Sequence, residues 1–255
     1  MPGDIEVVKL SKTYPPRLTP RSLLTGRRDP ARAALQEVSF QVGAGEVLGI
    51  IGPNGAGKST LLRILAGVLL PTSGSARVAG ADVVSRRAEA RRHVGAALSD
   101  DRGLSARLTP RQNLEFYGAL YGLEPAAVSA RIRDLSNRLD ATRLLDREVR
   151  TLSSGEKARV VLMRALLHSP HAVLLDELTR SLDPGAAERV RRHIREDVRD
   201  HQSALVLASH DLQEVEALCT RVLLLAQGRV VALGPFSEVK AAADRVFALG
   251  AEAAG

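Results

Sequence analysis

Aromatic side chains and cysteines are scarce in this sequence of 255 residues. Aromatics make up 3% of the chain, so the stacking platforms of single-stranded nucleic-acid readers are missing, and we expect no nucleic-acid partner. The single cysteine, Cys219, cannot form an internal disulfide, which favours a reducing compartment. Long apolar runs are also lacking, since none approaches the ~20 residues that cross a bilayer. The start Met1–Asp4 has no signal-peptide regions, so we expect a chain that is soluble in itself.

Charge is distributed unevenly along the chain. The net charge of +7 and pI near 10.1 would suit nucleic acid, anionic lipid or acidic cargo, and the scarcity of aromatics argues against the first. Between Tyr14 and the next expected strand, Leu35–Val42, Asp29 alone opposes five arginines, which are Arg17, Arg21, Arg27, Arg28 and Arg32. Pro and Gly interrupt this stretch, which predicts a surface loop. We hypothesise that it contacts lipid headgroups or a polyanionic substrate.

The dominant motif is a phosphate-binding loop at Gly52–Thr60. It follows Val47–Ile51, a short continuous apolar run typical of a strand buried on both faces of a parallel sheet. It precedes a helix with apolar residues on one side, which Gly67 can end. A helix N-terminus has unpaired backbone N–H groups and a favourable dipole, so it attracts an anion. Lys58 is expected to reach the β- and γ-phosphates of a nucleotide, and the Ser59 hydroxyl to ligate Mg²⁺.

Two further apolar runs end in polar residues. Ala172–Leu175 leads into Asp176 and Glu177, and Ala204–Ala208 leads into Ser209, His210 and Asp211. In α/β folds the carboxyl ends of such strands face the ligand. Asp176 suits a Mg²⁺-holding acid and Glu177 a base that activates water. His210 suits a contact with a γ-phosphate, although a helix cap at Asp211 with a bystander histidine would leave the same pattern.

The stretch between about 99 and 154 has a helical pattern and predicts a subdomain inserted into the sheet. Thr109 suits an N-cap and Pro110 the first helical position. At its end, Ser153 followed by Glu156 forms a capping box, which would present a second set of helix N–H groups to an anion. Upstream, Tyr14 follows an expected strand, Ile5–Leu10, and is a candidate for stacking on an adenine or for packing at the strand end.

Taken in order, these motifs resemble those of ATP-binding cassette (ABC) ATPases, and the resemblance runs from about Ile5 to Val239. It implies one α/β domain, 1–255, with a RecA-like parallel-sheet core, an N-terminal antiparallel β subdomain and the helical insertion. It also implies ATP and Mg²⁺ as ligands. Tyr14 would be the adenine-stacking residue, Asp183 the D-loop aspartate and His210 the switch histidine. The nucleotide-contacting residues would further include Gly52, Asn54, Gly55, Gly57, Lys58, Ser59, Thr60, Ser153, Gly155 and Glu156.

Some positions depart from the family pattern. The signature reads Leu-Ser-Ser-Gly-Glu rather than Leu-Ser-Gly-Gly-Gln, and Leu178 replaces the proline that usually follows the catalytic glutamate. Asp100, or Ser99, stands where the Mg²⁺-associated glutamine of the Q-loop is expected. Since Lys58, Asp176, Glu177 and His210 are all present, the resemblance still implies a working ATPase.

The resemblance implies partners as well. A head-to-tail homodimer would place each ATP between one subunit's phosphate loop and the other's signature. A separate transmembrane permease would hold the protein at the cytoplasmic face of the inner or plasma membrane, in contact with a surface near Asp100 to Asn113. The segment Asp101–Leu123 looks like exporters of drugs, lipid-linked molecules or polysaccharides. The alternative is a soluble ABC ATPase acting on ribosomes or nucleic acid.

Overall fold

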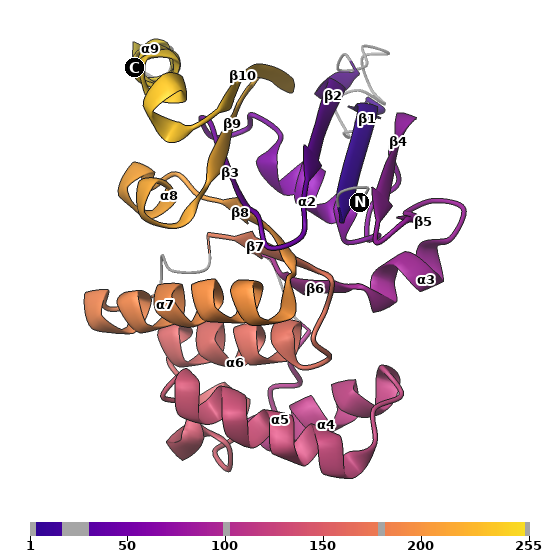
Figure 1. Cartoon of the computed structure of the whole chain (residues 1–255), viewed down its shortest axis with the longest axis vertical. Helices are drawn as coiled ribbons and strands as arrows, with labels where there is room; N and C mark the ends of the chain where they lie inside the picture. The colour runs from indigo at the N-terminus through magenta and orange to yellow at the C-terminus, as the bar shows by residue number, and fades with distance from the viewer. Residues whose placement is uncertain (1–3, 17–30, 99–102, 178–181, 253–255) are drawn as a thin grey trace, which may run out of the picture.

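A computed structural model describes residues 4–16, 31–98, 103–177 and 182–252. Its centre is a six-stranded sheet with the order β10-β9-β3-β8-β7-β6 (Figure 1). β3 pairs in parallel with β8 and β9, and β7 with β6 and β8, whereas β10 is antiparallel to β9. The strand bounds are β3 (Val47–Ile51), β6 (Val94–Ala97), β7 (Ala172–Asp176), β8 (Ala204–Ala208), β9 (Arg221–Ala226) and β10 (Arg229–Gly234).

Every residue of β3, β7 and β8 is buried, as their continuous apolar sequences predict. Alternate residues face two different cores. Leu174 and Val206 pack with α2 (Lys58–Leu65) and the antiparallel sheet, while Val173 and Leu205 pack with the helices of the opposite face. Helices therefore cover one face of the central sheet, and α2 together with a second sheet covers the other.

The second sheet is antiparallel, with the order β2-β1-β4-β5, and confirms the expected N-terminal β subdomain. Its strands are β1 (Ile5–Tyr14), β2 (Arg32–Val42), β4 (Ser73–Val78) and β5 (Ala81–Asp82), and α3 (Arg87–Arg92) follows. The prediction that β1 ends at Leu10 was wrong. A register irregularity between Val7 and Leu10, with Lys9 at φ +44°, breaks the two-residue periodicity while the strand continues.

The second strand also begins earlier than predicted, because Arg32 belongs to β2 rather than to the connecting loop. The rest of that basic segment, 17–30, lies outside the described residues, as do Ser99, Asp100 and Leu178. Thus only one of the five arginines assigned to the loop has a described position, and that position is in a sheet.

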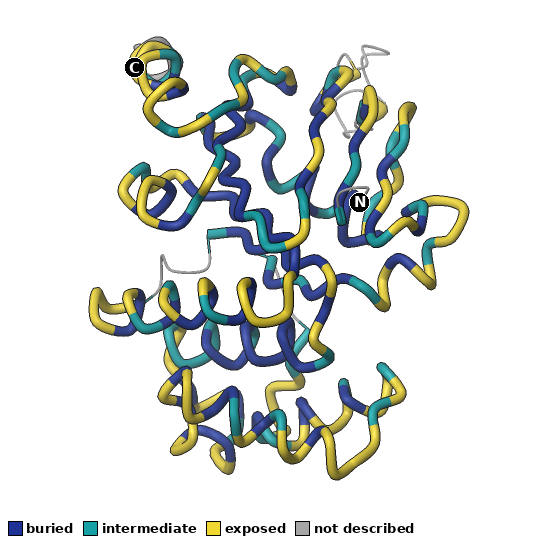
Figure 2. The backbone as a smooth tube through the Cα atoms, viewed as in Figure 1, coloured by how far each residue is buried: buried dark blue, intermediate teal, exposed yellow. Residues whose placement is uncertain are grey.

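The helices predicted between 99 and 154 are α4 (Pro110–Leu120) and α5 (Pro125–Arg138), followed by short 3₁₀ turns at Thr142–Leu144 and Val149–Thr151. Figure 1 shows α6 (Ser154–Leu166) and α7 (Pro184–His201) between these helices and the central sheet. The buried positions in Figure 2 follow the sheet and the inner sides of α6 and α7. α8 (Leu212–Leu218) and α9 (Phe236–Glu252) complete the chain.

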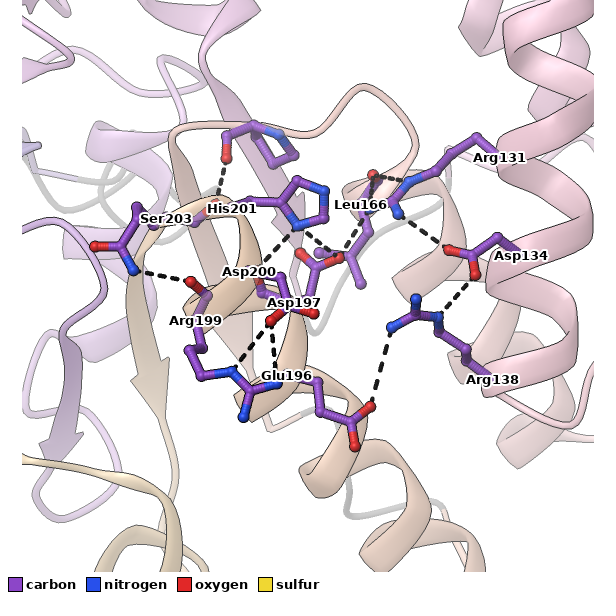
Figure 3. A network of polar contacts seen from close by, with 12 residues as sticks. Arg131, Asp134, Arg138, Leu166, Glu196, Asp197, Arg199, Asp200, His201 and Ser203 are labelled. Carbon is purple, nitrogen blue, oxygen red and sulfur yellow. Dashed lines mark hydrogen bonds and ion pairs between the residues drawn. The ribbon is translucent and has the colours of Figure 1, made fainter.

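A polar network joins α5 to α7 (Figure 3). Arg131 donates to the carboxylate of Asp197 over 2.8 Å and to the carbonyl of Leu166 at the end of α6 over 3.2 Å. Asp197 is 2% exposed, so removing Arg131 would leave a buried charge without its main partner. The network therefore joins α5, one of the outer helices, to α6 and α7, which pack on the sheet.

Candidate functional site

A cavity lies where β3 passes into α2, beside the antiparallel sheet. Its volume is about 860 Å³, and phosphate-loop residues from Asn54 to Thr60 form one wall. Tyr14 and Arg32 contribute from the antiparallel sheet, and Glu177 from the end of β7. The complete lining is Tyr14, Pro15, Pro16, Arg32, Ala34, Asn54, Gly55, Ala56, Gly57, Lys58, Ser59, Thr60, Arg63 and Glu177.

The phosphate loop has a backbone that requires glycine at two positions. Gly57 lies at φ +112°, and a Cβ there would come within 2.4 Å of the Ala34 carbonyl. At Gly52 a Cβ would come within 2.0 Å of the Leu225 carbonyl. Because Gly57 is the N-cap of α2 and has no side chain, the first N–H groups of the helix stay available to an anion. At the other end Gly67, at φ +64°, terminates α2 as predicted.

Lys58 opens α2 and turns back onto the loop. Its Nζ donates to the carbonyls of Gly52 over 2.6 Å and of Pro53 over 3.2 Å, and the residue is 7% exposed. Burial lowers the pKa of Lys58, while the carboxylates of Glu177 and Asp176 act in the opposite direction. The two acids at the end of β7 therefore lie near enough to interact with this ammonium group.

The acids differ in exposure and in backbone geometry. Asp176 is 5% exposed and ends β7. Glu177 follows at φ +53°, and its N–H donates to the Ala208 carbonyl over 2.9 Å. This left-handed conformation is uncommon outside glycine and turns the Glu177 side chain from the sheet towards the cavity.

The predicted glutamate and histidine meet. Nδ1 of His210 lies 3.1 Å from Oε1 of Glu177, and both residues line a second cavity of about 470 Å³. Glu177 therefore borders both cavities, with the phosphate loop on one side and His210 on the other. The alternative assignment of Asp211 as a helix cap is also correct, because its Oδ1 accepts from the N–H groups of Gln213 and Glu214 at the start of α8.

The sequence did not single out Glu214, which fixes the segment bearing His210. Its carboxylate accepts a hydrogen bond of 2.7 Å from the Ser209 hydroxyl, and Glu214 is 3% exposed. The Ser209 hydroxyl in turn accepts from the N–H of Asp211 over 3.1 Å. A glutamate five residues after a strand-end serine could have signalled this contact, but spacing alone does not show that the carboxylate turns inwards.

Tyr14 is the last residue of β1 and lies beside the phosphate loop. Its hydroxyl is 3.5 Å from Oγ1 of Thr60, and the Nζ of Lys12 lies 5.4 Å from its ring centroid. The ring thus lines the same cavity as the phosphate loop. Arg32, which was predicted to lie in the basic loop, lines it too and is the ladder partner of Tyr14.

The signature residues form the predicted capping box at the start of α6. Ser153 accepts from the N–H of Glu156 over 3.2 Å, and Glu156 accepts from the N–H of Ser153 over 2.8 Å. That hydrogen bond lowers the pKa of Glu156, with Arg147 adding to the effect. Among the described residues lining the phosphate-loop cavity, none comes from Ser153–Glu156. Asp183 likewise caps α7, where its carboxylate accepts from the N–H of Ala186 over 2.8 Å.

The oxygen donors suit a magnesium ion only in combination with a nucleotide. Ser59 lines the cavity and Asp176 ends the adjacent strand, whereas Asp100 lies outside the described residues. The described part of the chain has no cluster of three or more acidic, histidine or cysteine side chains arranged for a metal. Mg²⁺ is usually held by one or two protein oxygens together with substrate phosphates, so a hydroxyl and a carboxylate fit that ion.

A phosphate loop after a buried strand, acids at the next strand end and a histidine beside them define a P-loop nucleotide hydrolase. The family model described as ABC transporter matches residues 35–180, and this chain belongs to that family as an ATP-binding ATPase. No helix in the described part is long and apolar enough to span a bilayer.

Similar proteins agree with this assignment. ABC transporter ATP-binding protein NatA of Bacillus subtilis is 38% identical over 201 residues, or 79% of this chain and 81% of that protein. Nod factor export ATP-binding protein I of Mesorhizobium japonicum is 35% identical over 203 residues, or 80% of this chain and 59% of that protein. A solved ATP-binding subunit of an ABC transporter superposes with a TM-score of 0.81 at 26% identity, covering 97% of this chain and 99% of that one.

Proposed function

We propose that this chain powers an exporter by binding and hydrolysing ATP on the cytoplasmic face of a membrane, attached peripherally through a separate permease. The observation that carries the ATPase part is the 3.1 Å contact between Glu177 and His210 beside the phosphate-loop cavity. We further propose that residues 1–255 act as one nucleotide-binding domain, with 99–154 as its helical insertion.

In the proposed reaction, the backbone N–H groups of the loop and Lys58 bind the phosphates. Lys58 exchanges its bonds to the Gly52 and Pro53 carbonyls for phosphate oxygens. Ser59 and Asp176 would hold Mg²⁺, which neutralises charge on the phosphates when bound. Glu177 accepts the proton of the attacking water, and His210 holds that carboxylate and the γ-phosphate in position.

A second copy of the chain completes the site in this proposal. Ser153 and Gly155 sit at a helix N-terminus suited to an anion, yet they do not line the phosphate-loop cavity of their own chain. Docked head to tail, a partner subunit would present its signature to this cavity and its D-loop Asp183 to the dimer interface. ATP binding would close the dimer and hydrolysis would reopen it.

The permease would dock in a groove between the central sheet and the outer helices. This groove, of about 340 Å³, is lined partly by Leu98, Gly103 and Tyr117. Next to Tyr117, which lines the groove from α4, the side chain of Phe116 is 56% exposed, and that of Leu120 on the same helix is 64% exposed. Exposed apolar patches on a soluble surface favour a protein partner. Gly103, which lines the groove, belongs to the stretch 100–113 predicted to make this contact.

Export rather than import is supported by the names of relatives, one of which is called a Nod factor export protein. The alignment covers 59% of that relative, so its name indicates at most the chemical class of the exported substrate. A drug-like, lipid-linked or polysaccharide substrate is consistent with this comparison. No observation in the described residues favours action on ribosomes or nucleic acid.

The test is an affinity capture from detergent-solubilised native membranes with tagged Glu177→Gln protein and ATP. Recovery of a multi-helix membrane protein is the expected result, while recovery of ribosomes or nucleic acid would contradict the transporter assignment. The matched control combines Glu177→Gln with Phe116→Glu. It should retain ATP binding and lose the membrane protein, because a charge is introduced into the proposed docking surface.

A further inference from the structure

The first residue of β2 faces the same cavity as the adenine-stacking candidate. Arg32 and Tyr14 are direct partners in the antiparallel ladder. Residues opposite each other in such a ladder project to the same face of the sheet, with their Cβ atoms about 4.5–5.5 Å apart. Both side chains line the phosphate-loop cavity. The hairpin of β1 and β2 therefore brings an aromatic ring and a cation to one wall of the nucleotide site.

The Arg32 side chain reaches across to the phosphate loop itself. Its Nη2 lies 3.2 Å from the position that a Cβ on Gly55 would occupy. Gly55 has φ +80°, so the backbone already disfavours a side chain there, and the space beside it holds the guanidinium. Gly55 belongs to the loop whose N–H groups face the phosphates, which places this cation next to the path of a bound polyphosphate.

Arg32 and Lys58 both carry a positive charge, but they differ in burial and in the carboxylates near them. Lys58 is buried and interacts with the carboxylates of Asp176 and Glu177. Arg32 is exposed, and in the described ranges no carboxylate forms an ion pair with its guanidinium. An arginine presents a planar set of N–H donors that matches phosphate oxygens in a bidentate manner.

We propose that Arg32 is a nucleotide-binding residue that contacts the phosphates of ATP and ADP beside Gly55, from the wall of the cavity formed by the antiparallel sheet. The inference rests on the proposed function, since it requires ATP in this cavity. It adds a specificity element between the base, stacked on Tyr14, and the phosphates, held by the loop. A nucleotide would thus be contacted by residues of the β subdomain as well as by residues of the central sheet.

The test compares ATP and ADP affinity by calorimetry for the full chain and four variants. Arg32→Gln should weaken binding roughly tenfold, the loss expected for one charge-assisted hydrogen bond. Arg32→Lys should recover part of the affinity, because lysine keeps the positive charge but lacks the planar set of donors that binds a phosphate in a bidentate manner. Arg77→Gln is the matched control, since Arg77 lies on β4 of the same sheet outside the cavity lining. Lys58→Ala should weaken nucleotide binding if the nucleotide binds at the phosphate loop, so this variant tests the proposed site independently of Arg32.

Ionic strength supplies a second readout. A contact between an exposed cation and phosphate is screened by salt, so the difference between wild type and Arg32→Gln should shrink at high ionic strength. Arg32→Gln binding like wild type while Lys58→Ala is impaired would overturn this inference alone. A loss that is independent of salt and not improved in Arg32→Lys would also overturn it, because that would indicate packing. Absence of ATP binding by wild type would overturn the proposed site and this inference together.

Discussion

His210 and Glu177 come from different strand ends, 33 positions apart in the sequence, and their side chains meet at 3.1 Å. The parallel pairing of β7 with β8 aligns Asp176 with Ala208, which brings the residues after each strand to the same edge. Glu177 lines both the phosphate-loop cavity and the second cavity, and His210 lines the second. The Glu177 carboxylate could accept a proton from a water bound there, and His210 would hold that carboxylate in place.

Glu177→Gln should abolish ATP turnover and preserve ATP binding. The amide cannot accept the proton of the attacking water, and removing a general base costs roughly 10²- to 10⁴-fold in rate. Phosphate release and equilibrium nucleotide binding measure the two properties separately. Hydrolysis at the wild-type rate by this variant would show that another group is the base.

His210→Ala should lower kcat by roughly a hundredfold or more, with a smaller change in ATP affinity, because the Glu177 carboxylate loses its fixed neighbour. The control is His171→Ala. His171 directly precedes β7 at the opposite edge of the sheet, where it contacts His93. Steady-state kinetics should show normal turnover for His171→Ala, and an equal loss in both variants would argue against a specific role for His210.

The two capping boxes allow stability and catalysis to be separated. Ser153 caps α6 and Thr109 caps α4, each with reciprocal side-chain and backbone hydrogen bonds. Replacement of either cap by alanine should lower the free energy of unfolding by about 1 kcal/mol. Only Ser153→Ala should also lower turnover at saturating ATP, since only Ser153 would meet the nucleotide of a partner subunit. Denaturant titration and phosphate release provide the comparison, and equal turnover in both variants would contradict the signature assignment.

His168 should make the protein sensitive to acid. Its ring stacks on Tyr121 with centroids 3.7 Å apart, and burial lowers the pKa of His168 to about 4. The unfolded chain, with a histidine pKa near 6.5, binds the proton first as the pH falls. Stability is therefore lost as the pH falls from 6.5 to 4, and at pH 4.5 this one group lowers the free energy of unfolding by about 3 kcal/mol.

His168→Phe keeps the stacking on Tyr121 and removes the titrating group. Its free energy of unfolding should exceed that of wild type by more at pH 4.5 than at pH 7, and urea titrations at the two values give this difference. His201→Phe serves as the control, because His201 is exposed in part and bonds to Asp197. An identical pH dependence in wild type and His168→Phe would contradict the prediction.

Local patterns in the sequence were sufficient for much of the fold. Continuous apolar runs identified β3, β7 and β8, because strands buried on both faces need apolar residues at every position. The caps at Thr109 and Ser153 were also predicted, and the cap at Asp211 was one of two alternatives, because a cap depends on contacts within a few residues. β1 was predicted too short, since its register irregularity interrupts the alternation that marks a strand.

The sequence by itself determined the class of chemistry, through the order of the phosphate loop, the acids and the histidine. Tertiary structure decided which side chains meet. Arg32 lies opposite Tyr14 and beside Gly55 because the β1–β2 ladder has this register, and Glu177 meets His210 because β7 and β8 pair in parallel. Such contacts depend on strand register and on packing between distant segments, for which single-residue patterns give no local signal.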